Sequence, residues 1–301
     1  MKARAPGKLV LSGAYAVLEG APAIVAAVDR YAVADTKRRP SFYPPEVLQA
    51  LPKAQVPHVD VTALWEDDRK LGLGSSAAVV VSALGAWQWE RTPEASLEGV
   101  RDAILPLALQ AHRRAQGGGS GIDVAASAWG GFVSCHPSTE GLEIQSWLPP
   151  ETVQWRVYWS RSPSSTPRML KKVRHWASDD SSPYRRVMNR LDRAARLAAS
   201  PASSYELLEA LAEQVEGLTI LGDEARAPIV PRELRPLIEA AWKDGVVVMP
   251  SGAGGGDVVL LVGEAEACAR HEQAMLRAGM QRLEVNLGAR GLHRVRGPEG
   301  E

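Results

Sequence analysis

The stretch Lys70-Leu71-Gly72-Leu73-Gly74-Ser75-Ser76-Ala77-Ala78 organises the rest of this sequence. Two glycines separated by one residue lead into two hydroxyl side chains, and a small and apolar run follows from Ala77 to Leu84. Glycine permits positive φ and close approach of the backbone, and the run after it predicts a helix. Ser75 and Ser76 are then expected in the first helical turn, where free amides and the helix dipole favour an anion.

Two interpretations of this stretch stand on its residues alone. The first is a phosphate loop, in which the serine hydroxyls also ligate Mg²⁺. The second is a glycine turn capped by serine before a buried helix. No Gly-Lys-Ser/Thr closes the stretch, so it is not the common nucleotide-binding loop.

Composition predicts a soluble globular protein, because the residues are 45% hydrophobic and 23% charged. The length of 301 residues suits one large domain or, in preference, two of ordinary size. Thirty-five basic residues balance 35 acidic ones, so no nucleic-acid or membrane-surface partner is expected. The N-terminus has no signal-peptide core, and no apolar run approaches the length of a membrane span. Two cysteines and six histidines argue against a disulfide framework and a structural zinc site, and a cytoplasmic location is expected.

Strand and helix patterns occur in both halves, which predicts a mixed α+β chain. The pattern becomes mainly helical after about Ser160, so we expect one domain over residues 1–160 and a second over residues 161–301. The main helices are expected at residues 75–89, 96–116, 123–128, 166–177, 183–199, 204–222, 231–243 and 264–278.

Three glycine-rich stretches, residues 72–76, 117–121 and 252–256, each have a serine inside or just before them. Together they indicate a shared polyanionic ligand such as a triphosphate with its metal, because backbone amides can surround phosphate. The alternative is three independent turns, and a hairpin is a fair competitor at Gly255-Gly256, which lies between two expected strands.

Asp123 and Lys8 are candidate catalytic residues, each with a simpler structural interpretation. Asp123 is expected to cap a helix or to orient or deprotonate a substrate hydroxyl, and these roles are compatible. Lys8 is either solvated or placed beside Asp123, where an ammonium would attract phosphate.

His112 is interpreted as a structural histidine. The hydroxyl-rich turn around Ser164 and Ser165 caps a helix or forms an oxygen-rich ligand lip.

Taken together, these stretches resemble the GHMP kinases, a family of small-molecule kinases. The three family blocks occur in the expected order, at residues 5–20, 72–78 and 251–256. Within the family the chain is similar to the branch that phosphorylates 5-phosphomevalonate. That similarity lies in residues 13–19, 22–24, 27–30 and 119–127 and in the turn Ser164-Ser165-Thr166-Pro167. The most telling stretch is Pro250-Ser251-Gly252-Ala253-Gly254-Gly255-Gly256-Asp257.

The resemblance implies a two-domain GHMP-kinase-like fold. A mixed N-terminal domain over residues 1–160 holds the nucleotide, and a ferredoxin-like C-terminal domain over residues 161–301 helps to close the substrate site. The implied reaction transfers the γ-phosphoryl group of ATP to 5-phosphomevalonate, giving 5-diphosphomevalonate and ADP in the mevalonate pathway of isoprenoid synthesis. ATP and Mg²⁺ are the implied cofactors, and the partner is a small molecule.

The resemblance also assigns roles to residues. Lys8 neutralises charge between donor and acceptor, and Asp123 orients the acceptor or assists the metal. The ATP-binding residues are Gly72, Leu73, Gly74, Ser75, Ser76 and Ala77, of which Ser75 and Ser76 are the candidate metal ligands. The candidate substrate-binding residues are Lys70, Ser120, Ser164, Ser165, Ser251, Gly252, Ala253 and Gly254.

Departures from the family pattern keep two alternatives open. Ala14 stands where the family usually has Glu, and Met249 stands where this branch usually has Lys. The mevalonate-phosphorylating branch is the first alternative, but it usually carries Glu at the position of His112. A non-catalytic ligand-binding relative is the second, and the presence of Lys8, Ser75, Ser76 and Asp123 argues against it.

Overall fold

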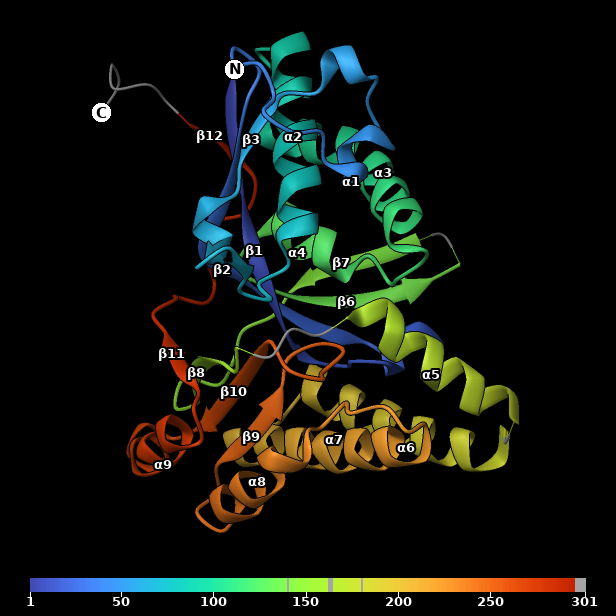
Figure 1. Cartoon of the computed structure of the whole chain (residues 1–301), viewed down its shortest axis with the longest axis vertical. Coiled ribbons are helices and arrows are strands. Elements are labelled where there is room, and N and C mark those ends of the chain that lie inside the picture. Colours follow the sequence, from blue (N-terminus) through green and yellow to red (C-terminus); the bar gives the residue numbers. More distant parts are fainter. Residues whose placement is uncertain (140, 162–164, 180, 296–301) are drawn as a thin grey trace. The chain divides into compact units, whose positions relative to one another are not determined.

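The computed structural model of the protein describes residues 1–139, 141–161, 165–179 and 181–295 (Figure 1). The chain forms two compact units. The first contains Met1–Leu9, Val25–Val133 and the segment from Asn286 onward, and the second contains Val10–Ile24 and Ser134–Val285.

The division expected at residue 160 therefore differs from the observed units, each of which is discontinuous in sequence. The difference arises because three strands, β1 (Lys2–Ser12), β2 (Ala23–Asp35) and β6 (Phe132–Ser138), each contribute residues to both units. The change toward helical character near Ser160 marks a change in local composition and not a boundary between packed units.

Strands in the first unit follow the order β12-β1-β2-β6, and β3 (His58–Asp60) also pairs with β2. The pairing of β1 with β12 (His293–Arg294) is antiparallel, with Ala3 opposite Arg294. A short hairpin, β4 (Trp65–Glu66) and β5 (Arg69–Lys70), leads to the glycine-rich stretch.

The helices of the first unit pack around α2 (Ser75–Arg91), which contacts both α3 (Leu97–Gln116) and α4 (Ile122–Trp129) (Figure 1). Residues Ala77–Ala86 of α2 are all buried, because small and apolar side chains cover every face of this part of the helix. The single-turn helix α1 (Pro45–Leu48) packs against both α2 and α3. Two 3₁₀ turns, η2 (Lys53–Gln55) and η3 (Thr62–Leu64), complete this unit.

The second unit contains an antiparallel sheet in the order β11-β8-β10-β9. The chain order of these strands and of the helices between them is β-α-β-β-α-β, which is a ferredoxin-like arrangement. The expected ferredoxin-like fold is thus present. The strands are β8 (Gln154–Trp159), β9 (Val247–Pro250), β10 (Val258–Gly263) and β11 (Gln281–Leu283), and β7 (Gly141–Ser146) lies beside β6.

Two long helices, α6 (Ser181–Ala199) and α7 (Ser204–Glu224), pack side by side in the second unit (Figure 1). Their buried residues share an apolar core with the 3₁₀ turn η1 (Ala16–Glu19). The remaining elements of this unit are α5 (Thr166–Asp179), η4 (Arg232–Leu234), α8 (Arg235–Trp242) and α9 (Ala265–Arg277).

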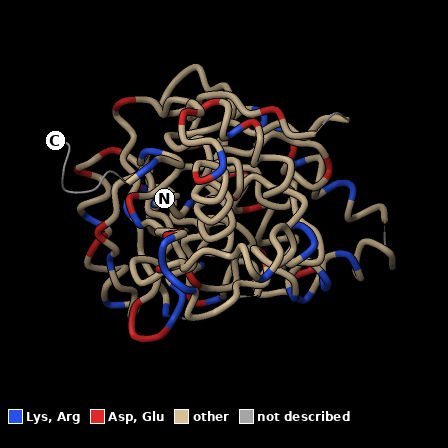
Figure 2. Tube along the Cα trace, turned by 90° about the horizontal axis from the view of Figure 1, so that it is seen from above, with Lys and Arg blue, Asp and Glu red and all other residues tan. Residues whose placement is uncertain are grey.

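Charged residues of both signs occur throughout the trace, in keeping with their equal numbers (Figure 2). Cys135 and Cys268 are both buried, and no disulfide bond joins them. Within the described part of the chain, no helix combines the length and apolar character that a bilayer crossing requires.

Candidate active site

The glycine-rich stretch forms a loop that ends at the first turn of α2. Gly72 and Gly74 have left-handed φ values of 76° and 72°, and α2 begins directly after Gly74 at Ser75. Among the described residues no side chain caps the amides at this helix end. The loop therefore leaves the positive end of a buried helix available to an anion.

Lys8, a residue of β1, lies against this loop. Gly7 and Gly74 have no side chains, so the strand and the loop can approach closely at this point. The Lys8 amide donates to the Leu73 carbonyl at 2.8 Å. A Cβ atom on Gly74 would lie 2.6 Å from Lys8 Cε, and one on Gly7 would lie 2.5 Å from the Leu73 carbonyl oxygen. The stem of Lys8 thus occupies the space that a side chain at Gly74 would need.

Asp123 forms an ion pair with Lys8, with 3.3 Å between Lys8 Nζ and Asp123 Oδ1. The side chains are 11% and 30% exposed, so a ligand can reach the carboxylate while the ammonium is largely enclosed. Asp123 lies in the first turn of α4, where the helix dipole favours its negative charge. The expected capping role is wrong, because Gly121 is the N-cap and no side-chain cap bond forms there.

Ser76 is the loop hydroxyl with side-chain partners. Its Oγ donates to Glu46 Oε1 of α1, and Gln116 Nε2 at the end of α3 donates to Ser76 Oγ at 3.0 Å. Sequence reasoning missed both partners. Pro45 followed by Glu46 is a helix-start signal that was available, but it lies in a proline-rich segment without periodicity.

His112 is buried on α3 beside these charged groups. Burial lowers the pKa of His112 below its ordinary value of 6.5, while the charges of Asp123 and Glu46 raise it and that of Lys8 lowers it. Desolvation is the largest of these effects, so the imidazole is neutral at pH 7. A neutral ring here adds no positive charge to the Lys8–Asp123 pair.

The third glycine-rich stretch belongs to the second unit. Ser251 Oγ accepts a hydrogen bond from the Val10 amide and donates one to the Val10 carbonyl, both at 3.0 Å. The Ser251 hydroxyl proton is therefore already donated to a backbone carbonyl. Gly254 packs tightly, because a Cβ atom there would lie 2.1 Å from the Ile229 carbonyl oxygen. The Ala253 carbonyl accepts from Tyr15 Oη at 2.8 Å.

Other predicted substrate-binding residues lie in more exposed positions. Lys70 is exposed on β5, with its ammonium 5.6 Å from the centre of the Trp65 ring. The Ser120 carbonyl accepts from Arg113 Nη2 at 3.3 Å. The Ser165 carbonyl accepts from the Met169 amide at the start of α5, and Ser164 lies outside the described residues.

The candidate residues are thus divided between the units. The first unit brings together Lys8, Asp123 and the loop of residues 72–77, and it also contains Lys70 and Ser120. The second contains Ser165 and residues 251–254. Met249 is a buried residue of β9, with 3% exposure. It stands where the branch that phosphorylates 5-phosphomevalonate usually has Lys.

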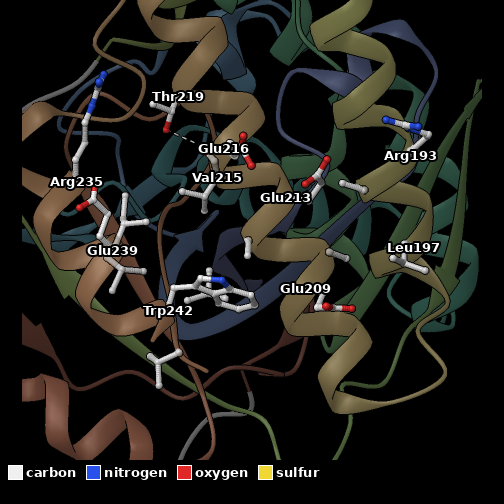
Figure 3. A pocket seen from close by; sticks show the side chains of 17 residues that line it. Arg193, Leu197, Glu209, Glu213, Val215, Glu216, Thr219, Arg235, Glu239 and Trp242 are labelled. Carbon is white, nitrogen blue, oxygen red and sulfur yellow. Dashed lines mark hydrogen bonds between the residues drawn. The ribbon is translucent and has the colours of Figure 1, made fainter. Parts of the chain in front are cut away.

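A cavity of about 710 Å³ lies in the second unit and contains none of the predicted site residues (Figure 3). Trp242 and Glu239 of α8 form part of one wall, and Glu209, Glu213 and Glu216 of α7 form part of another. Its lining residues are scattered over helices and a strand, so no local motif marks the cavity in the sequence.

Comparison with known proteins identifies a family model and several relatives that resemble this chain. Residues 47–131 match the family model described as GHMP kinases N terminal domain. The chain is 28% identical over 228 residues to phosphomevalonate kinase from Streptomyces sp. (strain CL190), covering 68% of this chain and 60% of that protein. It is 26% identical over 285 residues to mevalonate kinase from Archaeoglobus fulgidus, covering 86% of this chain and 91% of that protein.

Solved structures share the fold over nearly the whole chain. The Lin0012 protein from Listeria innocua superimposes with a TM-score of 0.82 at 23% identity, covering 99% of this chain and 100% of that one. Streptococcus pneumoniae phosphomevalonate kinase in complex with phosphomevalonate and AMPPNP gives a TM-score of 0.74 at 18% identity, covering 95% and 99%.

The chain therefore has the GHMP kinase fold, and residues 47–131, which include the second sequence block, match the GHMP kinase N-terminal domain model. Its homologues in that family are small-molecule kinases. Among them, the phosphomevalonate kinase and the mevalonate kinase have nearly equal sequence identities to this chain. The chain spans only 60% of the length of the Streptomyces relative.

The buried, neutral His112 gives a pH-dependent contribution to stability. Because its pKa is lower in the folded than in the unfolded state, the unfolded state binds more protons as the pH falls through about 6.5. We expect His112→Gln to make the free energy of unfolding less sensitive to acid between about pH 7 and pH 5. Urea denaturation over this range measures the effect.

His175→Gln, at an exposed histidine, is the matched control. Burial also lowers the pKa of His293, so the histidine contribution to acid sensitivity is reduced in His112→Gln and not abolished. An unchanged pH dependence in His112→Gln would contradict this account of its burial.

Proposed function

We propose that the chain is an ATP-dependent kinase that phosphorylates 5-phosphomevalonate, giving 5-diphosphomevalonate and ADP. The observation that carries the proposal is the Lys8–Asp123 ion pair, held against the glycine-rich loop at the start of α2. Similarity to phosphomevalonate kinase from Streptomyces supports the choice of acceptor. The Streptococcus pneumoniae enzyme of the same fold was solved in complex with phosphomevalonate and AMPPNP, which supports the choice of both substrates.

In this proposal the loop and Lys8 stabilise the phosphate groups. The amides at residues 74–76 and the α2 dipole face the triphosphate, and Lys8 offsets the charge that gathers as two phosphate groups approach. The bond between the γ-phosphorus and the β,γ-bridging oxygen breaks, and a bond to an acceptor phosphate oxygen forms. The electron pair of the broken bond stays on ADP.

Asp123 has a positioning role in this scheme. Its carboxylate holds Lys8 Nζ at 3.3 Å and thereby directs the ammonium toward the reacting phosphates. A phosphate acceptor is already ionised near neutral pH, so the reaction needs positioning and charge neutralisation more than a strong base. The neutral His112 is compatible with this requirement.

The residues of the first unit suit Mg²⁺, which prefers oxygen ligands and usually binds through one or two carboxylates together with substrate phosphates. Ser76 Oγ and the carboxylates of Glu46 and Asp123 supply such oxygens. In the described part of the chain, no group of three His, Cys, Asp or Glu side chains could hold a metal alone. When bound, the ion would neutralise charge on the triphosphate, with Ser76 as a ligand and phosphate oxygens completing its shell.

The nucleotide is proposed to bind the first unit, and the predicted substrate contacts are proposed for each unit by itself. Lys70 and Ser120 are proposed contacts from the first unit. Residues 251–254, with Ser164 and Ser165, are proposed contacts from the second. Because both Ser251 hydrogen bonds with Val10 occupy its hydroxyl, we expect backbone groups of this loop to contribute more than that side chain.

Mevalonate kinase is the second candidate function. It is favoured by similarity to the Archaeoglobus enzyme over 86% of this chain. An alcohol acceptor, unlike a phosphate, must lose a proton during transfer, which gives Asp123 a basic role. Lys8 beside Asp123 is compatible with either acceptor, so the choice between them depends on turnover.

The acceptor is tested by ADP release with ATP, Mg²⁺ and one of three acceptors: 5-phosphomevalonate, mevalonate or homoserine. We expect 5-phosphomevalonate to give the highest kcat/KM. Turnover of mevalonate but not of its phosphate would favour the second candidate. A protein that binds ATP but turns over no acceptor would instead be a ligand-binding relative.

The roles of the ion pair are tested with Lys8→Met and Asp123→Asn. Each is expected to lower kcat by about 100-fold or more while changing nucleotide affinity much less, because groups that stabilise or align the transition state act chiefly on turnover. Lys2→Met, at an exposed lysine of the same strand, is the matched control. Normal turnover in both variants would show that the assigned roles are wrong.

A further inference from the structure

The two loop serines differ in their surroundings. Ser76 Oγ contacts Glu46 Oε1 and Gln116 Nε2, which come from α1 and α3. The Ser75 hydroxyl forms no hydrogen bond with any described residue. Two elements distant in sequence therefore converge on only one of the two hydroxyls.

These contacts orient the Ser76 hydroxyl. A serine hydroxyl has one proton to donate and two lone pairs that accept. Gln116 Nε2 can only donate, so its hydrogen bond occupies one lone pair of Ser76 Oγ. The Glu46 carboxylate accepts, so the Ser76 hydroxyl directs its proton toward Glu46 Oε1. One lone pair of Ser76 Oγ remains, which is what an oxygen ligand must present to a cation.

Glu46 is well placed to maintain this orientation. It is half-buried in the first turn of α1, and α1 packs against both α2 and α3. Its second oxygen, Oε2, has no hydrogen-bond partner among the described residues. A carboxylate oxygen and an oriented hydroxyl therefore lie next to each other at the start of α2.

We propose that Glu46 is the positioning carboxylate of the metal-binding end of the phosphate loop. Glu46 accepts the hydrogen bond that the Ser76 hydroxyl donates, so that Ser76 and not Ser75 presents a lone pair to the metal ion of the bound nucleotide, and the negative charge of Glu46 strengthens that binding. This inference rests on the nucleotide site of the proposed function and is independent of the acceptor.

The experiment compares Glu46→Gln and Glu46→Ala with the wild-type protein. AMPPNP binding is measured by calorimetry without Mg²⁺ and at increasing Mg²⁺, which gives the Mg²⁺ concentration for half-maximal enhancement. Gln keeps an oxygen that can accept from Ser76 but removes the charge, whereas Ala removes both. Glu94→Gln, at an exposed glutamate of the same unit, is the matched control.

We expect both Glu46 variants to need about tenfold or more Mg²⁺, in line with the effect of residues that orient metal ligands. Binding of metal-free AMPPNP should be unchanged or stronger, because a negative charge near the phosphates is removed. Ser76→Ala should show the same increase in Mg²⁺ requirement, and Ser75→Ala should not. Thermal unfolding without ligand verifies that each variant is folded.

Three outcomes would overturn the inference, and a fourth would overturn only the proposed activity. If Glu46→Gln behaves as wild type while Glu46→Ala weakens all nucleotide binding, Glu46 serves the loop structure alone. If Ser75→Ala carries the Mg²⁺ effect, the assignment of the metal ligand is wrong. Absence of AMPPNP binding by wild type would reject the nucleotide site as well. Mg²⁺-dependent AMPPNP binding without turnover of any acceptor would reject only the proposed activity.

Discussion

The contact between β1 and the glycine-rich loop of residues 72–77 is the constraint on which the candidate site depends. The Lys8 amide is bonded to the Leu73 carbonyl, and the Lys8 stem fills the space beside the Cα atom of Gly74. This contact fixes the lysine at the start of α2 and lets its ammonium reach Asp123. Glycine at position 74 is therefore required twice, for its left-handed backbone and for the space given to Lys8.

The charged groups of the first unit differ in how strongly they are held. Lys8 is largely enclosed and paired with Asp123, whereas one oxygen of Glu46 and one lone pair of Ser76 remain available. His112 stays neutral because it is buried. Positive charge is thus concentrated on Lys8 and at the N-terminal end of α2. The oxygen atoms of Ser76 and Glu46 that could ligate a metal ion belong to the same unit. A site of this kind suits the transfer of a phosphoryl group between two anions.

Much of the fold is predictable from the sequence, because local patterns are strong where elements are long. The unbroken apolar run after Ser76 predicts the buried α2, and Gly72 with Gly74 predicts the loop before it. The boundaries of the compact units are not predictable in this way. They depend on strands such as β1, which contribute residues to both units, and no composition change marks that division.

The site was only partly predictable for a similar reason. Lys8, Asp123 and the loop stand out through motifs, but their proximity is a tertiary property that no local pattern contains. Glu46 belongs to a four-residue helix in a proline-rich segment, too short to show periodicity. The cavity beside Trp242 is formed by side chains from separate elements and has no signature in the sequence (Figure 3).

A crystal structure of the protein with AMPPNP, Mg²⁺ and 5-phosphomevalonate tests the central claim most directly. The account predicts that the triphosphate lies on the amides of residues 74–76 and that Lys8 Nζ contacts the γ-phosphate. Binding of the triphosphate elsewhere, such as in the cavity beside Trp242, or a γ-phosphate that Lys8 does not contact, would contradict it.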